Sequence, residues 1–127
     1  MKKIVINAAG VTVAAELSDN LTAEAIWKAL PIEGRVNRWG EEIYFSIPVS
    51  LDEASEARDV LDMGELGYWP PGRAFCIFFG PTPASRGSEI RAAGNVNVFG
   101  RISGDAKLFG KVPDGAKITI KGEAHGQ

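Results

Sequence analysis

The apolar run AFCIFF at residues 74–79 is the feature that most constrains what this chain can fold into. Prolines and glycines bound it on both sides, in WPPG at 69–72 and in GPTP at 80–83. A run of this length fits a strand, and a strand without alternating polar residues is buried on both faces. The chain therefore has to supply further layers of structure on each side of residues 74–79.

Alternating apolar and polar residues predict further strands along the chain. These predicted strands lie at residues 4–7, 11–17, 32–39, 41–47, 95–102 and 114–123. Residues 48–66 are polar and mixed, and a helical turn within 52–61 is one interpretation of them. Residues 80–94 are small and polar, which is typical of a long loop.

One main helix is predicted at about residues 22–30. Its apolar residues fall on one stripe, and Pro31 ends it. Either Asn20 or Thr22 provides its N-cap. A short second helix is expected at 104–112.

Together, about eight strands and one main helix predict a mainly β protein. A closed eight-stranded β-barrel is the expected architecture, because closure removes exposed strand edges. The helix at 22–30 would cap one end of this barrel. At 127 residues, the chain is expected to form a single domain, 1–127.

The charge balance argues against several partners. There are 14 basic and 16 acidic residues, a net charge of −2, and no cluster of Lys and Arg. We therefore expect no binding to nucleic acid or to anionic membranes. No apolar run approaches the ~18 residues of a membrane span. The chain is expected to be cytoplasmic, as a monomer or a weak homo-oligomer, and a single cysteine, Cys76, fits a reducing compartment.

The sequence predicts neither a metal site nor a cofactor. It lacks Cys/His metal-ligand spacing and the glycine patterns of nucleotide-binding loops. A Ser-His-Asp triad is excluded because His125, in the C-terminal tail, is the only histidine. Cys76 lies in the buried run without a visible activating group, so we do not interpret it as a nucleophile.

Several ordered strings resemble the small prokaryotic cyclophilin-like proteins, a family whose members are often of unknown function. They are WGEEIYF at 39–45, GYWPPG at 67–72, FFG at 78–80 with Thr82 and Pro83, and NVNV at 95–98. The C-terminal third, with VNVFGRISGD and AKITIKGEAHGQ, is also similar to the last strands of cyclophilins. The resemblance runs over residues 2–123 and implies a cyclophilin-like barrel.

Cyclophilins that isomerise prolyl bonds carry the motif Phe-His-Arg-Val after their first helix. Here the corresponding strand reads GRVNRW, so the resemblance makes Arg35 the nearest counterpart of the catalytic arginine and Arg38 a second candidate. In this interpretation Phe75 or Phe79 would form the floor of a proline pocket. The Phe-His pair is absent, and the site histidine and loop tryptophan have no counterpart between Gly80 and Val98.

The aromatic turn and the asparagines are candidates for ligand contacts. Tyr68 and Trp69 either belong to a rigid loop that caps the barrel or form the wall of a binding groove. Asn95 and Asn97 share one face of a strand, and they are either a hydrogen-bonded pair or a polar ladder facing a ligand. Asn37 could join such a ladder, because converging amides orient small ligands.

Four residues of the WGEEIYF string are interpreted mainly as structural. Trp39 and Tyr44 are expected in the core more than in a site. Glu41 and Glu42 could act as paired carboxylates in acid–base chemistry, but solvated charges at a turn are the favoured interpretation. Of the two, only Glu42 is expected to be buried or paired.

The favoured hypothesis is a binding module for a small molecule or a short proline-containing peptide. Its predicted ligand-binding residues are Asn37, Tyr68, Trp69, Phe75, Phe79, Asn95 and Asn97. The main alternative is a diverged peptidyl-prolyl isomerase that uses Arg35 or Arg38, so whether the chain is an enzyme stays open. A third possibility is a component of an amide-hydrolysing, ATP-dependent assembly, and a fourth is a structural or oligomeric role.

Overall fold

The computed structural model describes residues 2–123 and shows a mainly β protein with one α-helix. Its elements, in chain order, are β1 (Lys3–Ala8), β2 (Val11–Leu17), α1 (Leu21–Ala29), β3 (Ile32–Arg35), β4 (Asn37–Arg38), β5 (Glu42–Ser46), β6 (Arg58–Leu61), β7 (Glu65–Trp69), the 3-10 helix η1 (Pro70–Gly72), β8 (Ala74–Phe78), β9 (Ile90–Ile102), the 3-10 helix η2 (Ala106–Lys111) and β10 (Lys117–Gly122). Within these residues, no helix is both long and apolar enough to cross a membrane.

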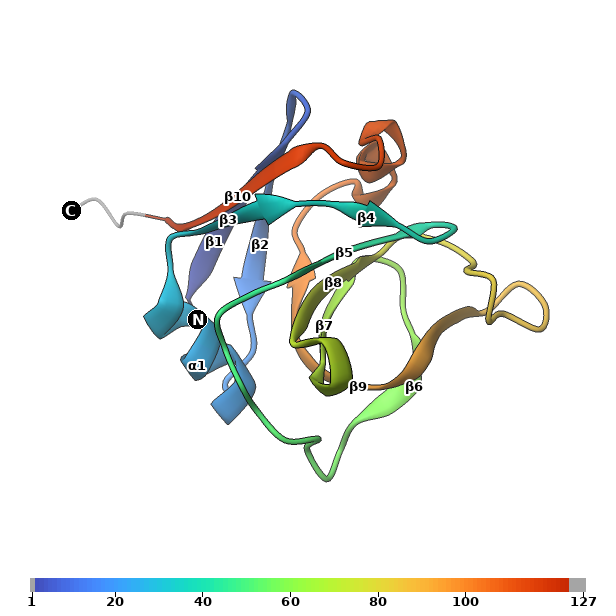
Figure 1. Cartoon of the computed structure of the whole chain (residues 1–127), viewed down its shortest axis with the longest axis horizontal. Coiled ribbons are helices and arrows are strands. Elements are labelled where there is room, and N and C mark those ends of the chain that lie inside the picture. The colour runs from blue at the N-terminus through green and yellow to red at the C-terminus, as the bar shows by residue number, and fades with distance from the viewer. Residues whose placement is uncertain (1, 124–127) are drawn as a thin grey trace.

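The strands form one antiparallel sheet that curls into a barrel (Figure 1). Its strand order is β3-β10-β1-β2-β9-β7-β8-β5-β4, and β6 pairs with the first half of β9. The outermost strands, β3 and β4, are not hydrogen-bonded to each other, so closure of the barrel by hydrogen bonds is not confirmed. They are instead consecutive along the chain, with only Val36 between them. The backbone itself therefore joins the two ends of the sheet.

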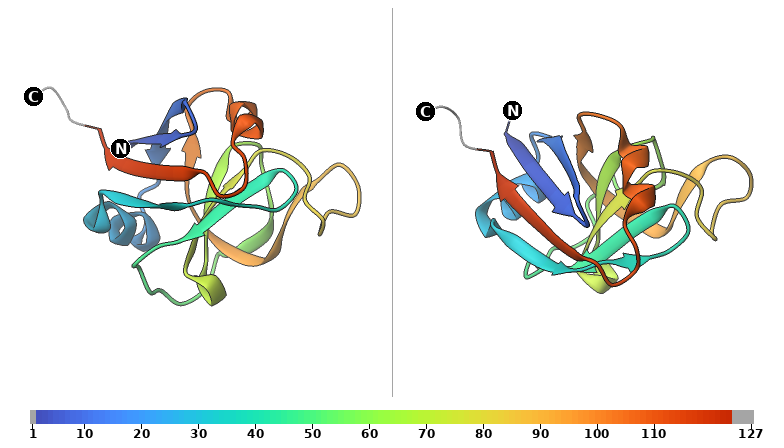
Figure 2. Two further views of the ribbon diagram at one scale, coloured as in Figure 1. Left: turned by 45° about the horizontal axis from the view of Figure 1, so that its top comes forward. Right: turned by 90° about the horizontal axis from the view of Figure 1, so that it is seen from above.

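The main helix begins and ends one residue earlier than the sequence predicts. The Asn20 side chain accepts a hydrogen bond from the Ala23 amide at 2.9 Å, which identifies Asn20 rather than Thr22 as the N-cap. Ile26 is fully buried in the core. The predicted short second helix is the 3-10 helix η2, and Figure 2 shows α1 and η2 on opposite sides of the molecule.

The eight-stranded count was wrong, because the structure has ten strands within residues 2–123. Strand β6 and the start of β7 fall in the segment 48–66 that the sequence left unassigned, and β6 occupies part of the helical turn considered at 52–61. Strand β9 begins at Ile90, inside the expected loop 80–94. These strands pair with segments distant in sequence, such as Val60 with Arg91, so local alternation could not identify them.

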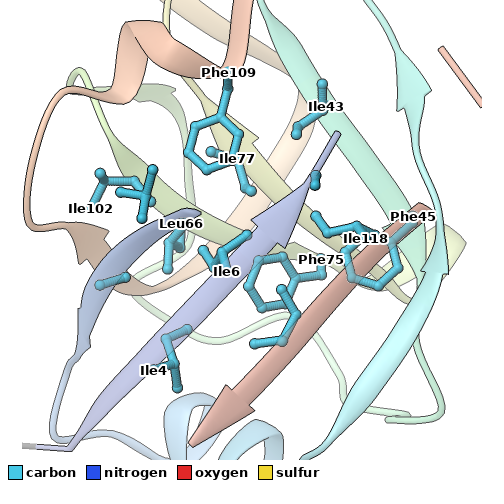
Figure 3. Packing of buried hydrophobic residues seen from close by; sticks show 14 of the residues in the cluster. Ile4, Ile6, Ile43, Phe45, Leu66, Phe75, Ile77, Ile102, Phe109 and Ile118 are labelled. Atoms are coloured by element: carbon cyan, nitrogen blue, oxygen red, sulfur yellow. The ribbon is translucent and has the colours of Figure 1, made fainter. Parts of the chain in front are cut away.

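Strand β8 is buried on both faces, as its sequence predicts. On the inner face, the Phe75 ring packs against Phe45 and Phe99, with ring centroids 5.5 and 5.0 Å away. Figure 3 shows Phe75 among the buried side chains of the barrel core. Burial of each such side chain stabilises the fold by about 1.5–3 kcal/mol.

The outer face of β8 carries a second, smaller apolar layer. Ala74, Cys76 and Phe78 point to this side, where β6 and the first half of β9 cover them. We call this the outer layer; its buried members are Leu61, Ala74, Cys76, Phe78, Ile90, Ala92 and Val96. At its edge, Tyr44 and Trp69 are only half-buried. The outer layer thus ends at a place where aromatic side chains meet solvent.

Gly100 lies where three strands approach one another. It pairs with Leu17 of β2 and with Leu66 of β7, and a Cβ added here would lie 2.6 Å from the Glu16 carbonyl oxygen. Contact with backbone cannot be relieved by a change of rotamer.

We predict that Gly100→Ala lowers the free energy of unfolding by about 1–3 kcal/mol, the usual cost of overpacking. Gly110→Ala is the matched control, since a Cβ there meets nothing within 4 Å. The control is expected to change stability by less than about 0.5 kcal/mol. Urea denaturation of both variants measures the difference, and equal losses would contradict the steric argument.

Candidate functional site

A tight turn between β4 and β5 brings an indole and a carboxylate together. The Trp39 amide donates to the Glu42 carbonyl at 2.9 Å, and the Glu42 amide donates back at 3.2 Å. Within this turn Gly40 has a φ of +62°. A Cβ at Gly40 would also lie 2.9 Å from the Thr82 Cα, so glycine is required both for conformation and for space.

Strand alternation then separates the side chains of β5 between two environments. Ile43 and Phe45 point into the barrel core, whereas Glu42 and Tyr44 point to the outer face. On the neighbouring strand, Cys76 lies opposite Tyr44 and shares this face. The pattern that builds the barrel therefore also places a carboxyl group among outer-layer side chains.

These side chains line a cavity of about 260 Å³ between the outer face of the sheet and the first half of β9. Its aromatic and acidic lining comes from Trp39, Glu42, Tyr44 and Trp69. The smaller lining residues are Cys76 from β8, and Ala92, Ala93 and Val96 from β9. We call this the outer-face pocket. Residues from five strands or their ends thus meet at one hollow.

Two glycines leave room for the indole ring of Trp69. A Cβ at Gly72 would lie 2.9 Å from the indole ring, and a Cβ at Gly94 would lie 3.4 Å from its Nε1. The left-handed residue of this turn is Arg73, with φ +47°, and not Gly72. Gly72 is therefore needed for space beneath the indole, and not for its φ.

Glu42 is the chemically unusual member of the pocket. It is only 5% exposed, and within residues 2–123 its Oε1 is the single buried side-chain oxygen or nitrogen without a hydrogen-bond partner. Burial raises the pKa of Glu42 to about 7, and contact with the Cys76 thiol offsets part of this increase. The group is thus close to half-protonated at neutral pH.

Cys76 is not activated by this neighbour. Its burial and the adjacent Glu42 carboxyl raise the pKa of the thiol well above its usual value. The thiol therefore stays protonated at neutral pH, and a protonated thiol is a poor nucleophile. This agrees with the sequence interpretation of Cys76.

A second buried glutamate provides the contrast. Glu65 is 4% exposed, but its carboxylate accepts two hydrogen bonds from Arg58, at 2.9 and 2.7 Å, and one from the Asp62 amide at 2.7 Å. Burial alone would raise the pKa of Glu65, yet these partners lower it overall. The carboxylate of Glu65 thus has a guanidinium and a backbone amide as partners, and Glu42 has neither.

Of the predicted ligand-binding residues, Trp69 alone lines the outer-face pocket. Tyr68, Phe75 and Phe79 lie in the barrel core with no exposed surface. The Tyr68 hydroxyl donates to the Val49 carbonyl at 2.6 Å and accepts from the Leu51 amide at 3.2 Å. Its polar end is therefore occupied by the chain itself.

The three asparagines do not converge. Asn97 is 2% exposed. Its side-chain NH2 group donates to the Asp52 carbonyl and the Thr22 hydroxyl, and its side-chain oxygen accepts from the Ala54 amide. Asn95 is exposed and donates to Glu53 at 3.2 Å. Asn37 is exposed too, and it donates to the Tyr44 carbonyl at 3.4 Å. The Asn97 contacts fasten the loop before β6 onto the barrel.

The arginines also lie away from the outer-face pocket. Arg38 donates through its guanidinium to the carbonyls of Gly40, Gly110 and Val112, at 2.7 to 3.1 Å. The same group lies 5.2 Å from the centroid of the buried Phe79 ring. Arg35 is exposed and donates to the Gly115 carbonyl at 3.2 Å. Arg38 thus connects the β4–β5 turn to η2.

Sequence reasoning assigned the other pocket residues to structural roles. Trp39 and Tyr44 were expected in the core, yet both are half-buried at the pocket. The expectation that Glu42 is buried is confirmed, although no partner pairs with its Oε1. The expectation that Glu41 is unpaired was wrong, because its carboxylate lies 3.6 Å from the Lys107 ammonium. The sequence signal that could have identified the pocket is Glu42, an acidic residue close to Trp39 and Tyr44 and on the strand face that does not enter the core. His125 lies outside the described residues, and residues 2–123 contain no group of acidic, Cys or His side chains arranged to hold a metal.

Comparisons with known proteins identify a family and structural relatives. The Cyclophilin-like family model matches residues 2–121. The solution structure of a hypothetical protein from Archaeoglobus fulgidus is similar, with 37% sequence identity and a TM-score of 0.80. The match covers 94% of this chain and 93% of that chain. No curated protein matches the sequence.

The asparagines yield a paired prediction. Asn97→Ala leaves the Ala54 amide and the Asp52 carbonyl without partners, so we expect unfolding to become easier by about 2–3 kcal/mol. Asn95→Ala, at an exposed position two residues away, is expected to cost less than about 0.5 kcal/mol. Chemical denaturation distinguishes them. A small effect at Asn97 would show that its hydrogen bonds do not support the fold.

Glu42 yields a prediction of pH dependence. Because its pKa is raised to about 7 in the folded state, its contribution to stability is present below the unfolded pKa and is lost as pH rises toward 7. Glu42→Gln removes this titration with little change of shape. Relative to wild type, the variant is expected to gain about 2–3 kcal/mol between pH 5 and pH 8.

The measurement is urea denaturation of both proteins at the two pH values. Other ionisable groups cancel in the difference between wild type and variant. A difference that does not depend on pH would show that the folded protein leaves the Glu42 pKa near its ordinary value.

Proposed function

Since the chain belongs to the cyclophilin-like family, we propose that it uses this fold as a binding module for a small molecule, held in the outer-face pocket. The observation that carries the proposal is the buried Glu42 oxygen, which lacks a partner and lines a cavity between three half-buried aromatic residues. Pockets that combine apolar walls with a few placed polar groups are the usual form of a ligand site.

Energetics support the assignment of this cavity to a ligand. An unsatisfied buried polar atom costs about 1–3 kcal/mol, and a folded protein with no use for that atom gains nothing from it. A ligand that donates a hydrogen bond to Oε1 would recover this cost on binding.

The size of the cavity limits the ligand. Its volume of about 260 Å³ lies just below the usual range for drug-sized ligands, roughly 300–1,000 Å³. It fits a molecule of a few heavy atoms, or one side chain of a short peptide. A peptide would therefore bind through a single inserted residue.

Prolyl isomerisation has less support as a function of this pocket. The reaction calls for hydrogen bonds to the twisted amide beside an apolar proline site. Neither Arg35 nor Arg38 lines the outer-face pocket, and the Phe75 and Phe79 rings are buried in the core. We therefore favour binding over catalysis.

Three tryptophans allow a direct test of binding. A fragment library, together with a panel of proline-containing tetrapeptides, is added to labelled protein while the indole signals are followed by NMR. Ligands are expected to shift the Trp39 and Trp69 signals and leave Trp27 unchanged, because Trp27 packs against Gly122 on another side of the barrel. The tetrapeptides are expected to interconvert at the uncatalysed rate.

Two variants assign any binding to the pocket. Ala93→Phe fills the hollow from an exposed position and is expected to abolish the shifts, whereas Val60→Phe on the exposed side of β6 keeps them. No shift from any ligand would overturn the proposal. Catalysed peptide exchange that Arg35→Ala or Arg38→Ala removes would establish the isomerase alternative instead.

A further inference from the structure

The lining of the outer-face pocket restricts the charge of its ligand. Three aromatic residues, Trp39, Tyr44 and Trp69, surround a hydrogen-bond acceptor on Glu42 that has no donor. None of the eight lining side chains is Lys, Arg or His. The site therefore combines aromatic side chains with a carboxyl oxygen, and no cationic side chain lines it.

We propose that the outer-face pocket recognises a primary alkylammonium group, which donates a hydrogen bond to Oε1 of Glu42 while aromatic faces surround its charge. This inference rests on the proposed binding function and names the class of ligand. The ammonium could come from a free small amine or from a lysine side chain.

Other ligand classes satisfy the site less completely. A carboxylate would bring a second negative group beside Glu42 and would meet no cation. An apolar ligand would occupy the hollow but leave Oε1 without a donor. A quaternary ammonium would gain the aromatic contacts, yet it carries no N–H. Of these four classes, the protonated primary amine alone satisfies both the aromatic walls and the acceptor.

Binding of a cation beside Glu42 is coupled to the release of a proton from its carboxyl group. Below pH 7 the free carboxyl of Glu42 is mostly protonated, because burial raises its pKa. The ammonium favours the carboxylate, so each binding event at pH 6 releases one proton from Glu42 to solvent and forms one ion pair. The other titratable groups that face Glu42 are Tyr44 from β5 and Cys76 from β8; Trp69 and the β9 residues Ala92, Ala93 and Val96 do not titrate.

The coupling predicts a specific pH profile. The affinity for n-butylammonium is expected to rise about tenfold per pH unit below pH 7 and to level off above it. Titration calorimetry in two buffers of different ionisation enthalpy should report close to one proton released at pH 6, roughly nine-tenths for a pKa of 7. n-Butanol, of similar size but neutral, is expected to bind at least about tenfold more weakly and independently of pH.

Neighbouring glutamates provide a matched pair of variants. Glu42→Gln keeps the shape of the pocket and is expected to abolish both the proton release and the preference for butylammonium over butanol. Glu41→Gln removes a half-buried charge one residue away, which pairs with Lys107 at 3.6 Å outside the pocket lining, and is expected to preserve both. Chemical denaturation establishes that each variant is folded at the temperature of the titration.

A further ligand distinguishes the two sources of the amine. Nα-acetyl-lysine-N-methylamide carries the same ammonium on a peptide-like backbone. If it binds as well as butylammonium, the pocket accepts a lysine side chain, whereas binding of butylammonium alone assigns a free amine.

Several results would overturn the inference. They are tighter binding of butyrate than of butylammonium, an affinity for butylammonium that does not depend on pH, and an unchanged preference in Glu42→Gln. The proposed binding function would survive each of them, provided that other fragments still shift the Trp39 and Trp69 signals. If butylammonium shifts neither signal, the amine assignment fails, and the fragment panel alone decides whether the pocket binds small molecules.

Discussion

The structure depends on one strand, β8, that is apolar on both faces. Phe75 and Ile77 fill the barrel from inside, and Ala74, Cys76 and Phe78 require cover from outside. A barrel by itself buries only the inner face of β8. The outer face is buried because β6 and the first half of β9 cover it with the outer layer. Because that layer is narrow, its edge leaves aromatic side chains half-buried. The outer-face pocket forms because the outer layer does not extend over Trp39, Tyr44 and Trp69.

Strand register connects this architecture to the chemistry of the site. A shift of one residue in β5 would move Ile43 and Phe45 out of the core and send Glu42 into it, which the fold could not tolerate. The free energy gained by burying Ile43 and Phe45 in the core therefore also fixes the Glu42 carboxyl on the outer face. Comparison with Glu65, which has Arg58 as a partner, shows that this fold can neutralise a buried carboxylate where it needs to. The unpaired state of Glu42 is thus a local property of the pocket, and not a general tolerance for buried charge.

Sequence patterns predicted the elements whose partners are close or whose burial is one-sided. The hairpin of β1 and β2, the helix α1 and the double burial of β8 all follow from local periodicity and turn residues. Strands β6 and β7 escaped prediction because their burial comes from pairing with distant parts of β9. Prediction of the candidate site failed for the same reason, because contacts with distant segments decide which polar atoms are free. Residue type suggested a ligand role for Tyr68 and Asn97, but their polar atoms bond to Val49, Asp52 and Ala54, in a loop that has no pattern of its own.

Arg38, in the string GRVNRW, shows how contacts within the protein limit what a side chain can offer to a substrate. Arg38 stands beside a phenylalanine, which on sequence grounds would suit an isomerase, but three backbone carbonyls occupy its guanidinium and the Phe79 ring is buried. A group held by that many internal acceptors has few N–H donors left for a substrate. Glu42 shows the opposite arrangement, with an acceptor that the protein leaves free and a cavity that leads to it. The proposed binding function requires unused hydrogen-bonding capacity at a cavity, and among residues 2–123 Glu42 provides it on the outer face of the sheet.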